Sequence, residues 1–168
     1  MAAKFAIVIV AAVAAMIVLL LAPGFSNNKD PSTDELQIKI EYSRQNLTKT
    51  QDGLLVAANS ELLVISNDGS ATYAKTSGSQ TDRQTFSVGS ADLKSLRALI
   101  GVGFMQIPQR DYLQKQGVEN FTKYTLKVQA DGDDNTVSWV DPDYHEGTIP
   151  PLIMRIGSQL DDIISRHA

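Results

Sequence analysis

Residues 5–22 form an uninterrupted apolar run, FAIVIVAAVAAMIVLLLA, that contains no charged or polar side chain. As an α-helix, such a run would extend about 27 Å, which is close to the hydrocarbon thickness of a bilayer. Nothing else in the chain is apolar enough to surround this helix in a soluble core. The run therefore predicts a transmembrane segment, and it sets the compartment of the residues that follow.

Two interpretations of this segment differ in whether it is removed. A cleaved signal peptide has a charged start, about 7–15 apolar residues and a small-x-small cleavage site. Here the apolar run is longer, and the best cleavage candidate, Ala22-Pro23-Gly24, has a proline at its centre. We therefore favour a retained signal anchor over residues 1–25, followed by a flexible stalk over residues 26–34. Residues 35–168 are then enough for one folded domain.

The orientation of the anchor follows from its flanking charges. Lys4 and the amino terminus precede the apolar run, whereas Lys29 after it is offset by Asp30. The positive-inside rule then places the C-terminal domain on the extracytoplasmic side of the cytoplasmic membrane, in a single-pass protein. Two glycosylation triplets, Asn46-Leu47-Thr48 and Asn120-Phe121-Thr122, agree with that side.

Composition excludes several classes of protein. The chain has no cysteine, so disulfides, thiolate chemistry and a bacterial lipoprotein anchor are excluded. Its net charge of −4 argues against a nucleic-acid surface. Lysine and arginine are scattered, so no cluster for anionic lipid is present. The expected partners are therefore the lipid bilayer and another protein; the sequence indicates no cofactor and does not identify a small-molecule ligand.

Alternation of apolar and polar residues predicts short strands in the outer domain. The predicted strands cover residues 36–42, 54–57, 61–65, 71–75, 84–88, 123–129 and 136–140. Asn67-Asp68-Gly69-Ser70 is the strongest hairpin signal, because glycine tolerates a positive φ and asparagine or aspartate comes next. Residues 44–53, 76–83 and 110–120 are predicted to be loops.

Two segments change to a helical period. From Ser90, a predicted cap, apolar residues recur at helical spacing up to Gly101 and Gly103, which end the helix. Pro150 and Pro151 open a second helix, in which the apolar residues form one face: Leu152, Ile153, Ile156, Leu160, Ile163 and Ile164. The order of strands, helix, hairpin and helix predicts an α+β domain with an antiparallel sheet and two helices packed on one face.

The loop after the last strand offers the best candidate metal ligands. Asp141, Asp143, His145 and Glu146 supply oxygen and nitrogen donors within six residues. The alternative, which we favour, is a solvated acidic loop with a proline turn. A second acidic segment, residues 131–135, resembles the start of a calcium loop. It lacks the glycine and glutamate that an EF-hand needs at positions six and twelve, so we interpret it as a hairpin turn.

Other chemistry-bearing residues are better explained by structure. Asp161 and Asp162 are adjacent on a helix, point about 100° apart, and fit a wet helix surface better than acid–base work. Trp139 shares a strand face with Val137, which favours core packing over an exposed binding role. No nucleophile elbow, zincin helix or P-loop occurs. We therefore expect no catalytic residue and a non-enzymatic protein.

A pattern of core positions in the C-terminal part of the chain gives a family likeness. The positions are Leu93, Leu96, Phe104, Pro108, Tyr124, Leu126, Val128, Val137, Pro150, Pro151 and Leu152. The block from Leu93 to Leu160, about two-fifths of the chain, resembles small α+β domains of the emfourin type, inhibitors of thermolysin-like proteases, and related extracytoplasmic domains. The anchor and the 44–53 insertion depart from that pattern. The resemblance implies a fold and an inhibitory activity, without any inhibitory residue.

These observations give a leading expectation and two alternatives. The leading one is a non-enzymatic, membrane-anchored extracytoplasmic protein-interaction domain, such as an accessory subunit of a membrane or envelope complex. Alanines at 11, 12, 14 and 15 give the anchor a small-residue surface for another helix, although alanine is equally a plain apolar helix former. The alternatives are a membrane-tethered protease inhibitor, and a metal-binding module or hydrolase that uses the 141–146 loop.

Overall fold

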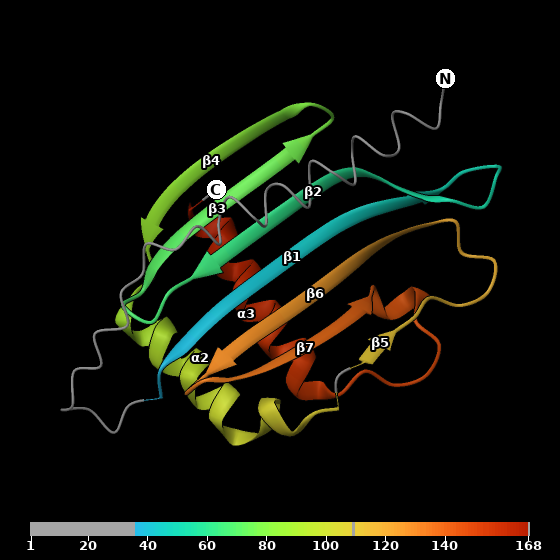
Figure 1. The fold of residues 1–168 in the computed structure, drawn as a ribbon. Helices are drawn as coiled ribbons and strands as arrows, with labels where there is room; N and C mark the ends of the chain where they lie inside the picture. The colour runs from blue at the N-terminus through green and yellow to red at the C-terminus, as the bar shows by residue number, and fades with distance from the viewer. Residues whose placement is uncertain (1–35, 109, 168) are drawn as a thin grey trace. The chain divides into compact units, whose positions relative to one another are not determined.

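The longest strand, β1 (Ile38–Lys49), lies in the middle of a seven-stranded sheet with the order β4-β3-β2-β1-β6-β7-β5 (Figure 1). The computed structural model describes residues 36–108 and 110–167. The other strands are β2 (Leu55–Ile65), β3 (Ser70–Ser77), β4 (Gln80–Ser87), β5 (Arg110–Tyr112), β6 (Asn120–Ala130) and β7 (Asp133–Val140). The predicted α+β class is confirmed.

The sheet is mixed, which corrects the expectation of a purely antiparallel one. All neighbouring strands are antiparallel except β5 and β7, which pair in parallel with Tyr112 opposite Trp139. The three residues of β5 lie in a segment predicted to be a loop. A strand this short has no readable alternation, so only its pairing with β7 defines it.

Two other predicted loops are also strand. β1 continues through residues 44–49, and β2 is one strand with a register shift opposite Asn46 and Leu47 rather than two short strands. The predicted loop 76–83 is a tight turn at Gly78 and Ser79 between β3 and β4. These segments carry polar side chains on both faces, so the apolar alternation that marks a half-buried strand is missing.

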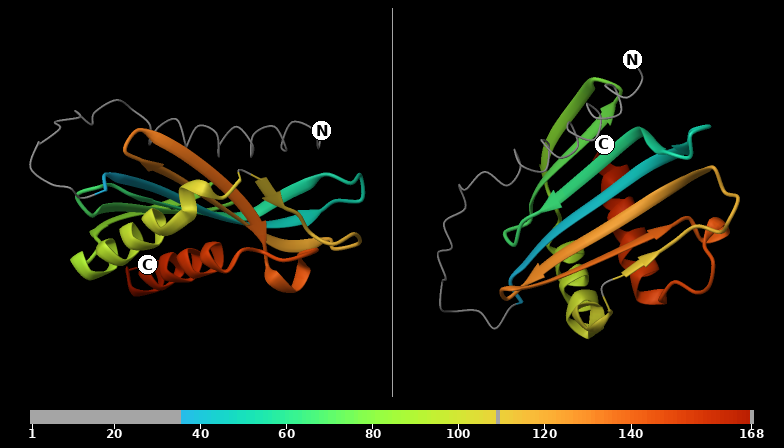
Figure 2. Two further views of the ribbon diagram at one scale, coloured as in Figure 1. Left: turned by 90° about the horizontal axis from the view of Figure 1, so that it is seen from below. Right: turned by 45° about the vertical axis from the view of Figure 1, so that its right-hand side comes forward.

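Both helices cover one face of the sheet, as predicted (Figure 2). They are α2 (Ser90–Gly103) and α3 (Pro151–His167). The short helix η1 (Phe104–Gln106) directly follows α2, and η2 (Pro142–Tyr144) lies between β7 and α3. Ser90 is the first helical residue rather than the cap, which is Gly89. The core between the two layers is formed by alternate residues of the central strands and the apolar faces of the helices, including Ile40, Leu63, Leu126, Val137, Leu96, Ile100, Ile153, Ile156 and Leu160.

The predicted hairpin turn between β2 and β3 is confirmed, and it also ties α2 to the sheet. Gly69 has a φ of 84°, which a side chain would strain. The Asn67 side-chain oxygen accepts hydrogen bonds from the Ile38 N–H at 3.1 Å and from Arg97 of α2 at 3.0 Å. One turn residue therefore joins the start of β1 to the helical layer.

The predicted anchor over residues 1–25 and the stalk over residues 26–34 lie outside the described residues. Among the residues that are described, no helix is long and apolar enough to cross a membrane.

Candidate binding site

Helix α3 covers only part of the sheet face on its side, which we call the helix-side face. Along β1, the side chains on this face pass from buried Ile40 and Tyr42 to half-buried Arg44 and then to exposed Asn46 and Thr48. Residues on one face of a strand alternate, so these five side chains form a single row. The row leads from the apolar core, past the margin of α3, onto an open polar surface.

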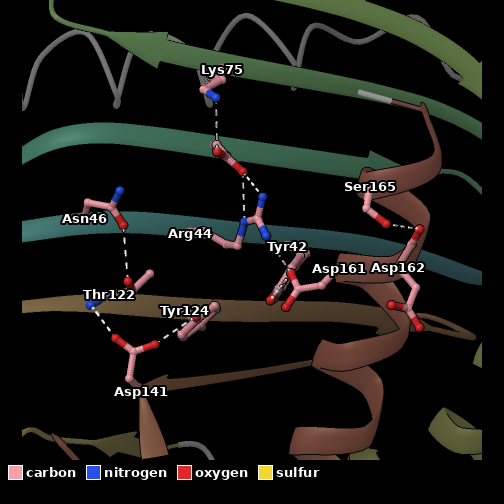
Figure 3. Close-up of polar contacts among 11 residues, drawn as sticks. Tyr42, Arg44, Asn46, Lys75, Thr122, Tyr124, Asp141, Asp161, Asp162 and Ser165 are labelled. Atoms are coloured by element: carbon pink, nitrogen blue, oxygen red, sulfur yellow. Dashed lines mark hydrogen bonds and ion pairs between the residues drawn. The ribbon is translucent and has the colours of Figure 1, made fainter.

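An ionic network lies where α3 meets that surface. The Asp161 carboxylate of α3 accepts hydrogen bonds from the Tyr42 hydroxyl at 2.9 Å and from Arg44 Nη1 at 3.0 Å (Figure 3). The same guanidinium bonds to Glu61 of β2, from Nε at 2.8 Å. Lys75 of β3 stands 3.8 Å from the other Glu61 oxygen. The network therefore joins three strands to one helix through groups that remain partly exposed.

Burial sets the protonation behaviour of this network. It raises the pKa of the Asp161 carboxyl, against the opposing hydrogen bonds and positive charge supplied by Tyr42 and Arg44. Burial and the neighbouring Asp161 charge raise the pKa of the Tyr42 hydroxyl. Burial, with Glu61 nearby, raises the pKa of Tyr73 to about 12. Both tyrosines therefore remain neutral hydrogen-bond donors at neutral pH.

A second hydrogen-bonded set lies on β6 and at the end of β7. The Asp141 carboxylate accepts from the Thr122 N–H and from the Tyr124 hydroxyl, each at 2.9 Å (Figure 3). The Thr122 hydroxyl in turn donates to the Asn46 side-chain oxygen at 3.2 Å. Burial and the bond to Asp141 raise the pKa of Tyr124 to about 12. These contacts fix the Tyr124 ring and leave the Asn46 amide group exposed beside it.

Three near-parallel aromatic rings form the floor between the two sets. The ring centroids of Tyr124 and Trp139 are 5.4 Å apart, and those of Tyr42 and Trp139 are 6.2 Å apart. A small hollow of about 140 Å³ opens above them against α3. It is lined by Tyr42, Tyr124, Trp139, Pro142, Met154, Gly157, Ser158 and Asp161. The hollow has the size of a few non-hydrogen atoms, and two of its lining residues, Tyr42 and Tyr124, are on the same strand faces as Arg44 and Thr122.

The structure separates the four candidate metal ligands of the 141–146 loop. Asp141 belongs to the Tyr124 set described above, and Asp143 is exposed, with its backbone carbonyl accepting from Lys115 at 3.1 Å. His145 is only 7% exposed, and Glu146 is exposed next to it. Within the described part of the chain, no group of three or more acidic, histidine or cysteine side chains could hold a metal ion.

His145 lines a different hollow, of about 410 Å³, with Asp111, Tyr112, Leu113, Gln114 and Glu146. Its Nδ1 is 2.9 Å from the Leu113 carbonyl oxygen, which can only accept, so Nδ1 carries the proton. The Tyr112 ring meets the imidazole edge-on. His145 therefore holds the 113–115 loop against the 141–146 loop, and the predicted solvated loop is in fact pinned at this residue.

Sequence reasoning found some members of the site and missed others. Trp139 is 2% exposed, as predicted for a core residue, and Asp161 and Asp162 do point apart. Asp161 was expected on the wet side of its helix, yet it faces β1. The available signal was Gly157, one turn earlier, because a small residue inside a helix indicates close approach of another element.

No protein-family model matches the chain, and no curated protein matches it.

Proposed function

We propose that this protein is a non-enzymatic, membrane-anchored interaction domain. Residues 5–22 hold it in the cytoplasmic membrane, and the domain described above lies on the extracytoplasmic side and binds a protein partner. The eighteen-residue length of the apolar run and the flanking charges support the anchor and its orientation. The docking surface is inferred from the distribution of exposed apolar side chains.

The observation that carries the docking surface is where those side chains lie. Among the described residues, the exposed large apolar side chains are Leu54, Leu55, Leu113, Tyr144 and Val102. Leu54 and Leu55 lie between the end of β1 and the start of β2, with Leu55 as the first residue of β2, and Leu113 and Tyr144 follow β5 and β7. The strand directions bring these positions to one end of the sheet. The chain enters β1 from Leu36, at the opposite end.

The geometry suits a partner that contacts the end of the sheet opposite the start of β1. The twelve residues of β1 extend about 40 Å between the entry point and the tip of the β1–β2 hairpin. The tip is held by backbone hydrogen bonds from Thr50 to Leu54 and from Gly53 to Thr50, at 2.8 and 2.9 Å. Two leucines, 59% and 46% exposed, are thus presented on an ordered turn. Burying their exposed halves in an interface would contribute roughly 1 kcal/mol each, about half of the value for a fully exposed leucine.

The test is purification of the full-length protein from its native membranes in a mild detergent after chemical crosslinking. We expect a stoichiometric protein partner that is lost with Leu54→Ser plus Leu55→Thr. Val102→Ser is the matched control, because Val102 is 80% exposed on α2 and away from the hairpin tip. A lone monomer in the wild-type preparation, or a partner that both variants retain equally, would refute the proposal.

The location needs a separate measurement. Extraction of native membranes at alkaline pH should leave the full-length chain in the pellet, and externally added protease should reach the C-terminal domain in sealed cells. Recovery of the intact chain from cytosol would refute the anchor. The resemblance to protease inhibitors is tested by titrating a thermolysin-like metalloprotease with the protein. Stoichiometric inhibition would identify the partner as a protease of this class, whereas the absence of inhibition would remove the support for an inhibitory activity.

A further inference from the structure

The two N-x-T triplets of the sequence lie side by side in the sheet. β1 and β6 pair with Asn46 opposite Thr122, Leu47 opposite Phe121 and Thr48 opposite Asn120. The triplets therefore run antiparallel and in register. Because strand residues alternate between faces, the asparagines and threonines all project from the helix-side face, and the leucine and phenylalanine project from the other.

A fifth residue extends this arrangement across β2. Asn59 is paired with Asn46 and so shares its face. We call these five side chains, Asn46, Thr48, Asn59, Asn120 and Thr122, the amide patch. Asn46, Thr48 and Asn120 are exposed, and Asn59 and Thr122 are half-buried. The patch thus offers three amides and two hydroxyls, all uncharged, on one open sheet surface beyond the margin of α3.

The amide patch adjoins Tyr124, which lines the hollow between the sheet and α3. Tyr124 follows Thr122 on the same face of β6, and its hydroxyl is held by Asp141. The Thr122 hydroxyl donates to the Asn46 side-chain oxygen, so these two side chains of the patch are oriented toward each other. A ligand on the patch would therefore meet a row of neutral polar groups that ends at an aromatic ring.

The chemistry of this row selects one class of ligand. An anionic ligand would meet the carboxylates of Asp141, Asp161 and Glu61, and a cationic ligand would meet Arg44 and Lys75. An apolar surface would bury amides without partners, at about 1–3 kcal/mol each. A neutral polyhydroxylated ligand avoids these costs, because amides and hydroxyls both donate and accept at sugar hydroxyls. We propose that the amide patch and Tyr124 bind a neutral polysaccharide.

This site borders the protein-docking end proposed above, because Thr48 and Asn120 lie at that end of β1 and β6, and its test uses a different readout. The full-length protein is titrated, in a detergent without a sugar headgroup, with hexamers of glucose, xylose and N-acetylglucosamine, and with an acidic galacturonate hexamer as the charged control. Binding is followed by calorimetry and by the fluorescence of Trp139, the single tryptophan of the chain, which stacks on Tyr124. We expect saturable binding of at least one neutral hexamer and none of the acidic one.

Variants separate the patch from the rest of the sheet. Asn46→Ala with Asn120→Ala should weaken that binding by about tenfold or more, the loss of one or two net hydrogen bonds. Gln45→Ala is the matched control, because Gln45 is the neighbour of Asn46 on the opposite face. The affinity of this variant for the neutral hexamer should equal that of the wild type. Thr122→Ser should retain binding, because the hydroxyl remains.

Three outcomes would overturn the proposal. The first is no heat and no fluorescence change with any neutral hexamer at millimolar concentration. The second is equal affinity of the wild type and the double alanine variant, both checked for an unchanged thermal transition. The third is an intact mass that shows sugar already attached at Asn46 or Asn120, because a covalent glycan would occupy the amides themselves.

Discussion

A Cβ atom at position 157 would stand 2.9 Å from Cζ2 of the Trp139 indole. Real Cβ contacts are longer, so α3 can lie this close to β7 only because residue 157 is glycine. Gly157 is buried in the middle of α3, where alanine would otherwise favour the helix by about 1 kcal/mol. The close approach also places Asp161, one turn later, within reach of Tyr42 and Arg44.

We predict that Gly157→Ala destabilises the domain. Overpacking a core contact costs about 1–3 kcal/mol, which exceeds the gain in helix propensity. Gly101→Ala is the control, since its Cβ would meet only Leu36, at 3.9 Å, and should be neutral or stabilising. Thermal unfolding of both variants measures the difference. Equal stabilisation by the two substitutions would mean that α3 does not depend on the glycine for its distance from Trp139.

Asp161 should make the stability depend on pH in an unusual direction for a carboxylate. Its pKa is raised by burial, so the folded state binds the proton more tightly than the unfolded chain. The corresponding stability is present at low pH and is lost as the pH rises through the raised pKa. The free energy of unfolding of the wild type, relative to Asp161→Asn, should therefore fall over the pH range that starts near the ordinary aspartate pKa of about 4 and extends through the raised pKa.

Denaturant titrations of the two proteins across that range measure the difference. Asp162→Asn serves as the control, because Asp162 is the exposed neighbour on the same helix. A gap between wild type and Asp161→Asn that widens as the pH rises would show that the attraction of Arg44 outweighs burial.

Tyr124 should contribute to alkaline unfolding. Its pKa is raised to about 12 by burial and by its bond to Asp141, so the unfolded chain loses this proton first. Stability is then present below the ordinary tyrosine pKa of about 10 and falls as the pH rises from there towards 12. Tyr124→Phe should reduce that fall, and Tyr144→Phe, at an exposed tyrosine, is the comparison variant. Unfolding free energies and ultraviolet absorbance of phenolate measure both effects.

Asn135 should be the most costly polar residue to remove. It is 2% exposed, and its amide nitrogen donates to the backbone carbonyls of Phe104 and Ile107 at 2.8 and 2.9 Å. Asn135→Ala removes this donor from the Ile107 carbonyl and leaves the Phe104 carbonyl with the Ile107 N–H, which should cost about 1–3 kcal/mol. Gln129→Ala, on an exposed position of β6, is the control. A loss below about 0.5 kcal/mol would mean that water replaces the amide.

Local patterns were enough for much of the architecture. The helical spacing of apolar residues located α2 and α3, and the Asn67–Ser70 signal located the β2–β3 turn, because both depend on neighbouring residues alone. The alternation around Trp139 also placed it in the core. The candidate site was less predictable than the fold. Residue type alone indicated the 141–146 loop, but Asp141 and Asp143 make different contacts in the fold and do not converge.

The sequence by itself determined the helices and strands in which apolar residues recur at a regular spacing. It also contains the apolar run that predicts an anchor. What only the tertiary structure decided is how far α3 extends across the sheet. Beyond its margin, β1 and β6 have no core to face, so their side chains are polar on the helix side and carry no strand signal. The same margin turns Asp161 inward and brings two distant N-x-T triplets into register, because strand pairing acts between residues far apart in the chain.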